Sequence, residues 1–282
     1  MQEKGGWESL EVVNYFAEYD GIAFKLFGDR VKKWVTHNEP IVPIEGCYLY
    51  GFHYPKINDF RRGIKATYYT ILSNAKAVKK FRELRERGVL SKDSTIGAIL
   101  SMSPVYPRDE NHVEDVKAAK ICELFFTNSF LDPMVKGTFN KELLKLLKTH
   151  NLLSDFYTEE ELTIIKENTI DFLGFNYYFS RRVKSKDILS EGEVNNPEYF
   201  FDHYELPERL FNKDRDWEIY PKGVCDLLML LKDEYSNIPV YISENGIGRH
   251  NGDQEDTDEN GYINDDARIE FVKGHLNILI RG

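Results

Sequence analysis

The fold is decided by residues 240–246, which read Val-Tyr-Ile-Ser-Glu-Asn-Gly, and by residues 35–40, which read Val-Thr-His-Asn-Glu-Pro. Each stretch is interpreted as a β-strand with a glutamate, Glu244 or Glu39, at its carboxyl end. The two glutamates lie far apart in the chain, so only a fold that gathers strand ends can pair them. A (β/α)8 barrel does this, because the carboxyl ends of its parallel strands form one rim.

Helix-like and strand-like segments alternate along the rest of the chain. Apolar residues recur at helical spacing, for example at Val12, Phe16, Tyr19, Ala23 and Phe27. A doubly wound sheet and a (β/α)8 barrel both fit this order, but no Gly-x-Gly-x-x-Gly follows a strand, which favours the barrel. The long polar stretch 180–216 is predicted to be an excursion without regular structure. We predict strands at 31–36, 95–100, 171–178 and 238–242, and helices at 9–27, 64–88, 114–126, 141–148, 158–168, 221–235 and from about 265 onward.

The composition excludes several classes of protein. The 282 residues carry 37 basic and 47 acidic side chains, a formal net charge of −10, which argues against nucleic acid as a partner. No apolar run approaches the roughly 18–20 residues of a membrane helix, and the first residues show no apolar signal segment. The three cysteines are far apart and never form a Cys-x-x-Cys pair. We interpret them as reduced thiols of a cytoplasmic protein.

Metal binding is not expected. Residues 256–261 match the first half of an EF-hand loop, but Ala267 stands where calcium needs a bidentate glutamate. The stretch is therefore interpreted as an acidic surface loop. The histidines form no cluster at ligand spacing, and no Gly-x-Ser-x-Gly elbow is present. The chain is expected to need no cofactor.

Paired carboxylates at one rim suit glycoside hydrolysis. One carboxylic acid protonates the leaving oxygen while the other carboxylate attacks the anomeric carbon. The retaining form of the reaction places the two carboxyl groups about 5–5.5 Å apart. At that distance the charge of Glu244 is expected to raise the pKa of Glu39, which keeps the acid protonated.

The two motifs resemble the signature motifs of glycoside hydrolase family 1, the retaining β-glycosidases with a (β/α)8 barrel. Four further stretches resemble that family in the same order, and the similarity covers essentially all 282 residues: 27–34, 171–178, 217–223 and 262–269. Two positions depart from the usual pattern. Ser243 stands where threonine is usual, and His37 replaces an apolar residue and is expected to influence Glu39.

The resemblance implies a role for each matching residue. Glu39 corresponds to the acid/base and Glu244 to the nucleophile. The substrate-binding residues that it implies are Asn38 for the sugar 2-hydroxyl, Asn176 for the glycone site, Tyr178 as a hydroxyl donor to Glu244, and Trp217 on the leaving-group side.

Family members are much longer than this chain, which therefore resembles a fragment. The implied fold class is α/β, an incomplete (β/α)8 TIM barrel with strands 4 to 7 and helices 3 to 7, in which residues 1–282 form a single partial catalytic domain. Such a sheet should be an open arc with residues 31–36 at one edge and 238–242 at the other. The exposed edges are expected to pair with another chain and form oligomers.

The stretches 216–248 and 265–276 most resemble the bacterial 6-phospho-β-glucosidase and 6-phospho-β-galactosidase branch. The family's phosphate-binding residues lie beyond Gly282. The resemblance thus implies retaining hydrolysis of β-glucosides or 6-phospho-β-glucosides. Two alternatives stay open: a catalytically inactive remnant or sugar-binding module, and a metal-dependent isomerase barrel, against which the lack of a ligand cluster counts.

Overall fold

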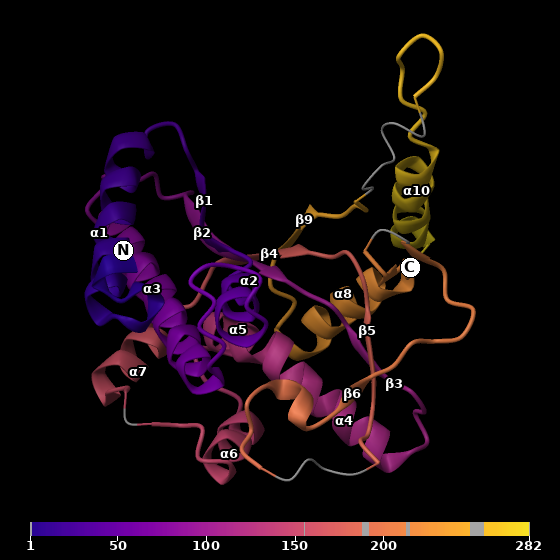
Figure 1. The fold of residues 1–282 in the computed structure, drawn as a ribbon. Helices are drawn as coiled ribbons and strands as arrows, with labels where there is room; N and C mark the ends of the chain where they lie inside the picture. Colours follow the sequence, from indigo (N-terminus) through magenta and orange to yellow (C-terminus); the bar gives the residue numbers. More distant parts are fainter. Residues whose placement is uncertain (1, 155, 188–191, 213–214, 249–256, 282) are drawn as a thin grey trace.

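Four parallel strands form the main sheet of the computed structural model, which describes residues 2–154, 156–187, 192–212, 215–248 and 257–281. The strands pair in the order β1-β2-β4-β9 (Figure 1). All four predicted strands are present with slightly shifted ends. Their bounds are β1 Lys33–Asn38, β2 Thr95–Ser101, β4 Phe172–Asn176 and β9 Val240–Glu244.

Helices cover the sheet and connect its strands, as the apolar spacing predicts. Figure 1 shows α1 and α3 side by side near the N terminus, and α8 and α10 at the other end of the sheet. Side chains define several helix starts, because the first backbone N–H groups of a helix have no partner within it. Asp59 caps α3, and Thr158 with Glu161 forms the predicted capping box of α7. The longer helices are α1 Leu10–Phe27, α3 Phe60–Glu86, α4 Val113–Glu123, α6 Lys141–Thr149, α7 Glu159–Glu167, α8 Lys222–Glu234 and α10 Asp266–Arg281.

Several short segments complete the helical layer. The chain after β1 forms α2 and a π-helical turn, η3, which carry it from the sheet to α3. The helix predicted at 114–126 continues beyond α4 through two further π-helical turns. The bounds are α2 Ile41–Ile44, η3 Glu45–Leu49, η4 Leu124–Asn128, α5 Ser129–Leu131 and η5 Asp132–Lys136.

The apolar face predicted for α1 is partly wrong. Tyr19 is 68% exposed and Phe27 48% exposed, whereas Ala17 and Phe24 are buried against α3. The helix carries apolar residues on more than one face, so its spacing alone does not select the face that packs. Contact with α3 selects the face of Ala17 and Phe24.

The prediction of no regular structure in 180–216 is also wrong in part. Strand β5, Arg181–Lys184, pairs with β3, Val105–Pro107, on one side and with β6, Asp202–His203, on the other. Strand β7, Phe211–Asn212, pairs with β8, Trp217–Glu218, in a two-stranded antiparallel ribbon. These strands are too short to show an alternating pattern of apolar residues. Arg182 joins β5 to the ribbon through hydrogen bonds of 2.8 and 2.9 Å to the Glu218 carboxylate.

Strands β1 and β9 lie at the two edges of the main sheet. Val35 on β1 is 42% exposed, and Tyr241 and Ile242 on β9 are 43% and 37% exposed. The central strand β4 is buried at every residue. Across the sheet, the Lys33 ammonium lies 4.4 Å from the Tyr241 ring centroid, so the sheet curls and brings its edge strands toward each other.

No helix in the described part of the chain is both long and apolar enough to cross a membrane. The three cysteines are free thiols, with Cys47 and Cys122 buried.

The 282-residue chain, produced by itself, should associate through its edge strands, because unpaired strand edges and exposed apolar side chains are templates for pairing. Size-exclusion chromatography should show species larger than the 33.0 kDa monomer. Lysine at both Val35 and Ile242 should reduce association, since charges on edge strands oppose pairing. A monodisperse wild-type monomer with a sharp thermal melt would contradict the expectation.

Candidate active site

The carboxyl ends of β1, β4 and β9 bring polar residues from distant parts of the chain together. Asn176 ends β4 and lies in register with Glu244 at the end of β9. Glu39 follows β1, and its backbone N–H donates to the carbonyl of Ile99 on β2 at 2.9 Å. Parallel strands thus place side chains from distant parts of the sequence at one end of the sheet.

The Asn176 side chain links all three strand ends. Its Nδ2 donates to Glu39 Oε1 at 2.9 Å and to Asn38 Oδ1 at 3.2 Å. Its Oδ1 accepts a hydrogen bond from the Ser243 hydroxyl at 2.6 Å. The residue is only 1% exposed, so these partners replace water for both ends of the amide. The NH2 group faces two oxygen acceptors, Glu39 Oε1 and Asn38 Oδ1, and the amide oxygen is thereby left to accept from the Ser243 hydroxyl.

Tyr178 connects the loop after β4 to Glu244. Its hydroxyl donates a hydrogen bond to Glu244 Oε2. Burial raises the pKa of Tyr178, and the negative charges of Glu244 and Glu39 raise it further. The hydroxyl therefore stays protonated and available as a donor to a carboxylate.

Both glutamates line one cavity of about 620 Å³. Trp217 lines it as well, held by near-parallel packing on the Phe179 ring with 4.9 Å between centroids. Arg215 also lines this cavity and was not predicted from the sequence, because it lies in a polar stretch without periodicity. The lining residues are Glu39, Tyr178, Arg215, Trp217, Ser243, Glu244, Asn245, Gly246, Ile247 and Gly248.

Glu39 has a left-handed backbone, with φ of 49°. This conformation is unusual for a residue with a side chain and costs of order 1–3 kcal/mol. A register shift between Val35 and Asn38 in the pairing of β1 with β2 precedes it. Bulges of this kind redirect side chains at strand ends. The local backbone therefore turns the Glu39 carboxylate toward Asn176.

A buried ion pair holds the segments that follow Glu39 and Tyr178. Glu45 Oε1 in η3 accepts from Arg181 Nη2 in β5 at 2.8 Å, and both side chains are largely buried. Burial raises the pKa of Glu45, and the charge of Arg181 opposes that change. The guanidinium also lies 4.1 Å from the Phe126 ring centroid. No spacing pattern in the sequence indicates this pair.

His37 points away from the cavity. Its Nε2 lies 2.9 Å from the Ser73 hydroxyl of α3, and its ring stacks on Phe16 of α1 at 4.5 Å. Burial lowers the pKa of His37 to about 4, so the ring is neutral near pH 7. The sequence led us to expect that His37 influences Glu39, but these contacts of His37 are with Ser73 and Phe16.

Within the described ranges, no cluster of three or more His, Cys, Asp or Glu side chains is placed to hold a metal ion. The Asp258 carboxylate of the acidic stretch accepts from the backbone N–H groups of Asn260 and Tyr262 at 2.9 Å each. It acts as a turn former there. Asp256, the first residue of the EF-hand-like stretch, lies outside the described residues.

Known proteins match this chain over nearly its whole length. The model of glycosyl hydrolase family 1 matches residues 1–281. The chain is 49% identical over 282 residues to 6-phospho-beta-glucosidase GmuD of Bacillus subtilis (strain 168), covering 100% of this chain and 59% of that protein. It is 36% identical to beta-glucosidase A of Acetivibrio thermocellus, covering 98% of this chain and 57% of that protein.

Solved structures agree with these sequence matches. A beta-glucosidase from Exiguobacterium marinum superposes with a TM-score of 0.84 at 28% identity, over 99% of this chain and 59% of that one. A family 1 b-glucosidase from Thermotoga maritima superposes with a TM-score of 0.81 at 32% identity, over 97% of this chain and 56% of that one. The chain thus spans less than two thirds of the length of these relatives.

Replacing Ser243 by alanine should leave the buried Asn176 Oδ1 without its donor. The free energy of unfolding should fall by about 1–3 kcal/mol, the cost of an unsatisfied buried polar group. Ser243→Thr keeps a hydroxyl on the same carbon, so its free energy of unfolding should fall much less. Urea unfolding of the three proteins measures the difference, and equal stability of the alanine variant and the wild type would show that the bond does not hold Asn176.

Proposed function

Because the chain belongs to glycosyl hydrolase family 1, we propose that it carries the two catalytic carboxylates of a retaining β-glycosidase. The observation that carries the proposal is the shared cavity of Glu39 and Glu244, with Asn176 bonded to the first and Tyr178 to the second. Double displacement at an anomeric carbon requires two carboxyl groups, one as nucleophile and one as acid and base.

In the first step the Glu244 carboxylate attacks the anomeric carbon. Glu39, as the acid, gives its proton to the glycosidic oxygen, so the leaving alcohol departs neutral and a covalent glycosyl-enzyme forms. The Tyr178 hydroxyl, bonded to Glu244 Oε2, holds the nucleophile in place and stabilises its charge before the attack.

In the second step Glu39 acts as a base. It takes a proton from a water molecule, whose oxygen attacks the anomeric carbon and releases Glu244. Asn176 Nδ2 donates to Glu39 Oε1 and holds the carboxyl group in place for this step. No cofactor takes part in either step.

The remaining residues bind the sugar. Asn38 is assigned to the 2-hydroxyl and Asn176 to the glycone site from the resemblance to the family, and the hydrogen bonds of Asn176 to Asn38 and Glu39 are consistent with these assignments. Trp217 is assigned to the leaving-group side, where its packing on Phe179 keeps the indole rigid. An aromatic face suits both sugar C–H groups and aryl aglycones.

We assign residues 1–282 to a single partial (β/α)8 catalytic domain, with β1, β2, β4 and β9 as barrel strands 4 to 7. The coverage of only 59% of the Bacillus subtilis relative and the unpaired sides of β1 and β9 support this assignment. The remaining strands of the barrel would come from chain outside these residues.

The proposed substrates are β-glucosides, with 6-phospho-β-glucosides preferred. The 49% identity to a protein named 6-phospho-beta-glucosidase exceeds the 36% identity to one named beta-glucosidase A. A phosphorylated sugar and three free thiols both fit a cytoplasmic location. Neither nucleic acid nor a membrane is a proposed partner.

In the protein with a complete barrel, Glu244→Ala should lower kcat by about 10⁴-fold or more on every aryl substrate, because no nucleophile remains. Glu39→Ala should lower kcat by about 10²–10⁴-fold for substrates with poor leaving groups. The loss should be far smaller for dinitrophenyl substrates, because dinitrophenolate departs without a proton. Steady-state kinetics on aryl β-glucosides with and without a 6-phosphate tests both.

The exposed Glu193 supplies a matched control, and Glu193→Ala should retain wild-type rates. Equal losses for all leaving groups in Glu39→Ala would remove Glu39 from the acid role. Binding without turnover by the wild-type protein would support the inactive or sugar-binding alternative.

A further inference from the structure

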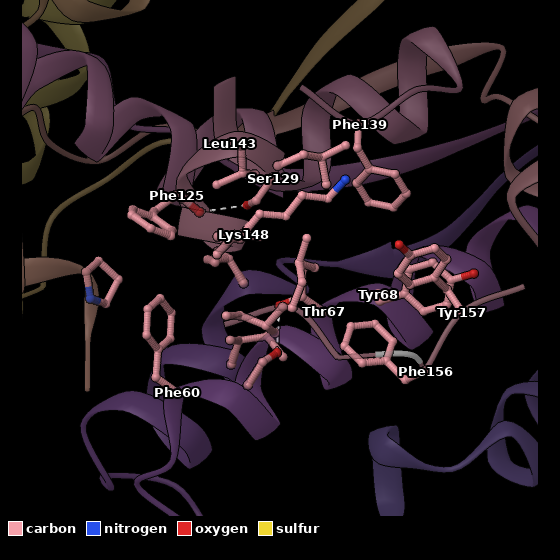
Figure 2. Close-up of a pocket in the computed structure, with 18 of the residues that line it drawn as sticks. Phe60, Thr67, Tyr68, Phe125, Ser129, Phe139, Leu143, Lys148, Phe156 and Tyr157 are labelled. Atoms are coloured by element: carbon pink, nitrogen blue, oxygen red, sulfur yellow. Dashed lines mark hydrogen bonds between the residues drawn. The ribbon is translucent and has the colours of Figure 1, made fainter. Parts of the chain in front are cut away.

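A second cavity of about 260 Å³ lies in the helical layer, away from Glu39 and Glu244. Figure 2 shows its walls, which come from α3, α6, the η4–α5 segment and the loop before α7. It has no lining residue in common with the cavity of the two glutamates. No step of the proposed reaction uses it.

Aromatic rings line both ends of this cavity. In Figure 2, Phe60 and Phe125 lie at one end, and Phe139 and Phe156 at the other. Aliphatic side chains fill the wall between them, with Leu143 among those labelled in the figure. Aromatic pairs attract through edge-to-face and offset geometries, so a flat ring bound here would find partners on either side.

The hydroxyl groups in the middle of the wall already have partners. Ser129 Oγ donates to the Phe125 carbonyl at 2.7 Å, and Thr67 Oγ1 donates to the Gly63 carbonyl at 2.9 Å. Neither offers a free proton to a ligand or to water. The charged residues of the lining, Lys148 and Glu159, are exposed to solvent. The interior is therefore suited to an apolar occupant, because water in a cavity needs two to four polar partners.

We propose that this cavity is a binding site for an uncharged molecule of one or two fused aromatic rings. Its volume exceeds the roughly 150 Å³ of a dry cavity that holds benzene and lies below the 300–1,000 Å³ of sites for drug-sized ligands. A charged ligand is excluded from the interior, because a charge would be desolvated there without a partner.

The site would place its ligand against the segment that leads away from Glu39. Ile41 and Ile44 of α2 and Leu49 of η3 line the cavity. A bound ring fills space behind this segment and should reduce its local opening. The proposal concerns binding alone and does not depend on the proposed glycosidase activity.

Indole, which fits the size and has no charge, is the probe. In the protein with a complete barrel, a concentration about ten times the dissociation constant should raise Tm by about 1–2 °C. Ser129→Leu places a branched side chain in the cavity and should abolish the shift. Ser129→Ala leaves the space open and should retain it.

Thr67 supplies a second pair of variants, Thr67→Leu to fill the cavity and Thr67→Val as the isosteric control. Hydrogen exchange provides an independent readout, since indole should slow exchange in residues 41–49 of the wild type and not in the filled variants. The proposal is overturned if indole leaves the wild-type Tm unchanged. It is also overturned if the shift persists in both filled variants, which would place the indole elsewhere, for example beside Trp217.

Discussion

The amide of Asn176 is the constraint on which the site depends. It comes from the buried strand β4 and bonds to Glu39 and Asn38 on one side and to Ser243 on the other. Since it is only 1% exposed, these protein partners take the place of water around the amide. One side chain thus fixes how the ends of β1 and β9 lie relative to β4.

The position of Glu39 requires support from outside the sheet, because its left-handed backbone is unfavourable. Ile41 and Ile44 anchor the next turn in the core at 8% and 4% exposure. Glu45 then ties the same segment to Arg181, which follows Tyr178 in the chain. The segments that carry Glu39 and Tyr178 are therefore held by packing and by a buried charge pair. Both of these interactions lie away from the cavity.

Periodicity predicted the strands and the longer helices, because a buried strand and an amphipathic helix repeat their pattern over many residues. It could not select the packed face of α1 or detect strands as short as β7. For the site, the positions of Glu39 and Glu244 at strand ends were predicted, and both line one cavity. The bond from Ser243 and the lining residue Arg215 depend on tertiary geometry, which no local spacing encodes.

The central claim is that Glu244 forms a covalent bond to the sugar. A 2-deoxy-2-fluoro aryl β-glucoside, with or without a 6-phosphate, slows the second step and should let the intermediate accumulate in the protein with a complete barrel. Mass spectrometry of the digested protein should find one fluoroglycosyl group, carried by the peptide that contains Glu244. A label on a different residue, or turnover with inversion and no label, would contradict the account.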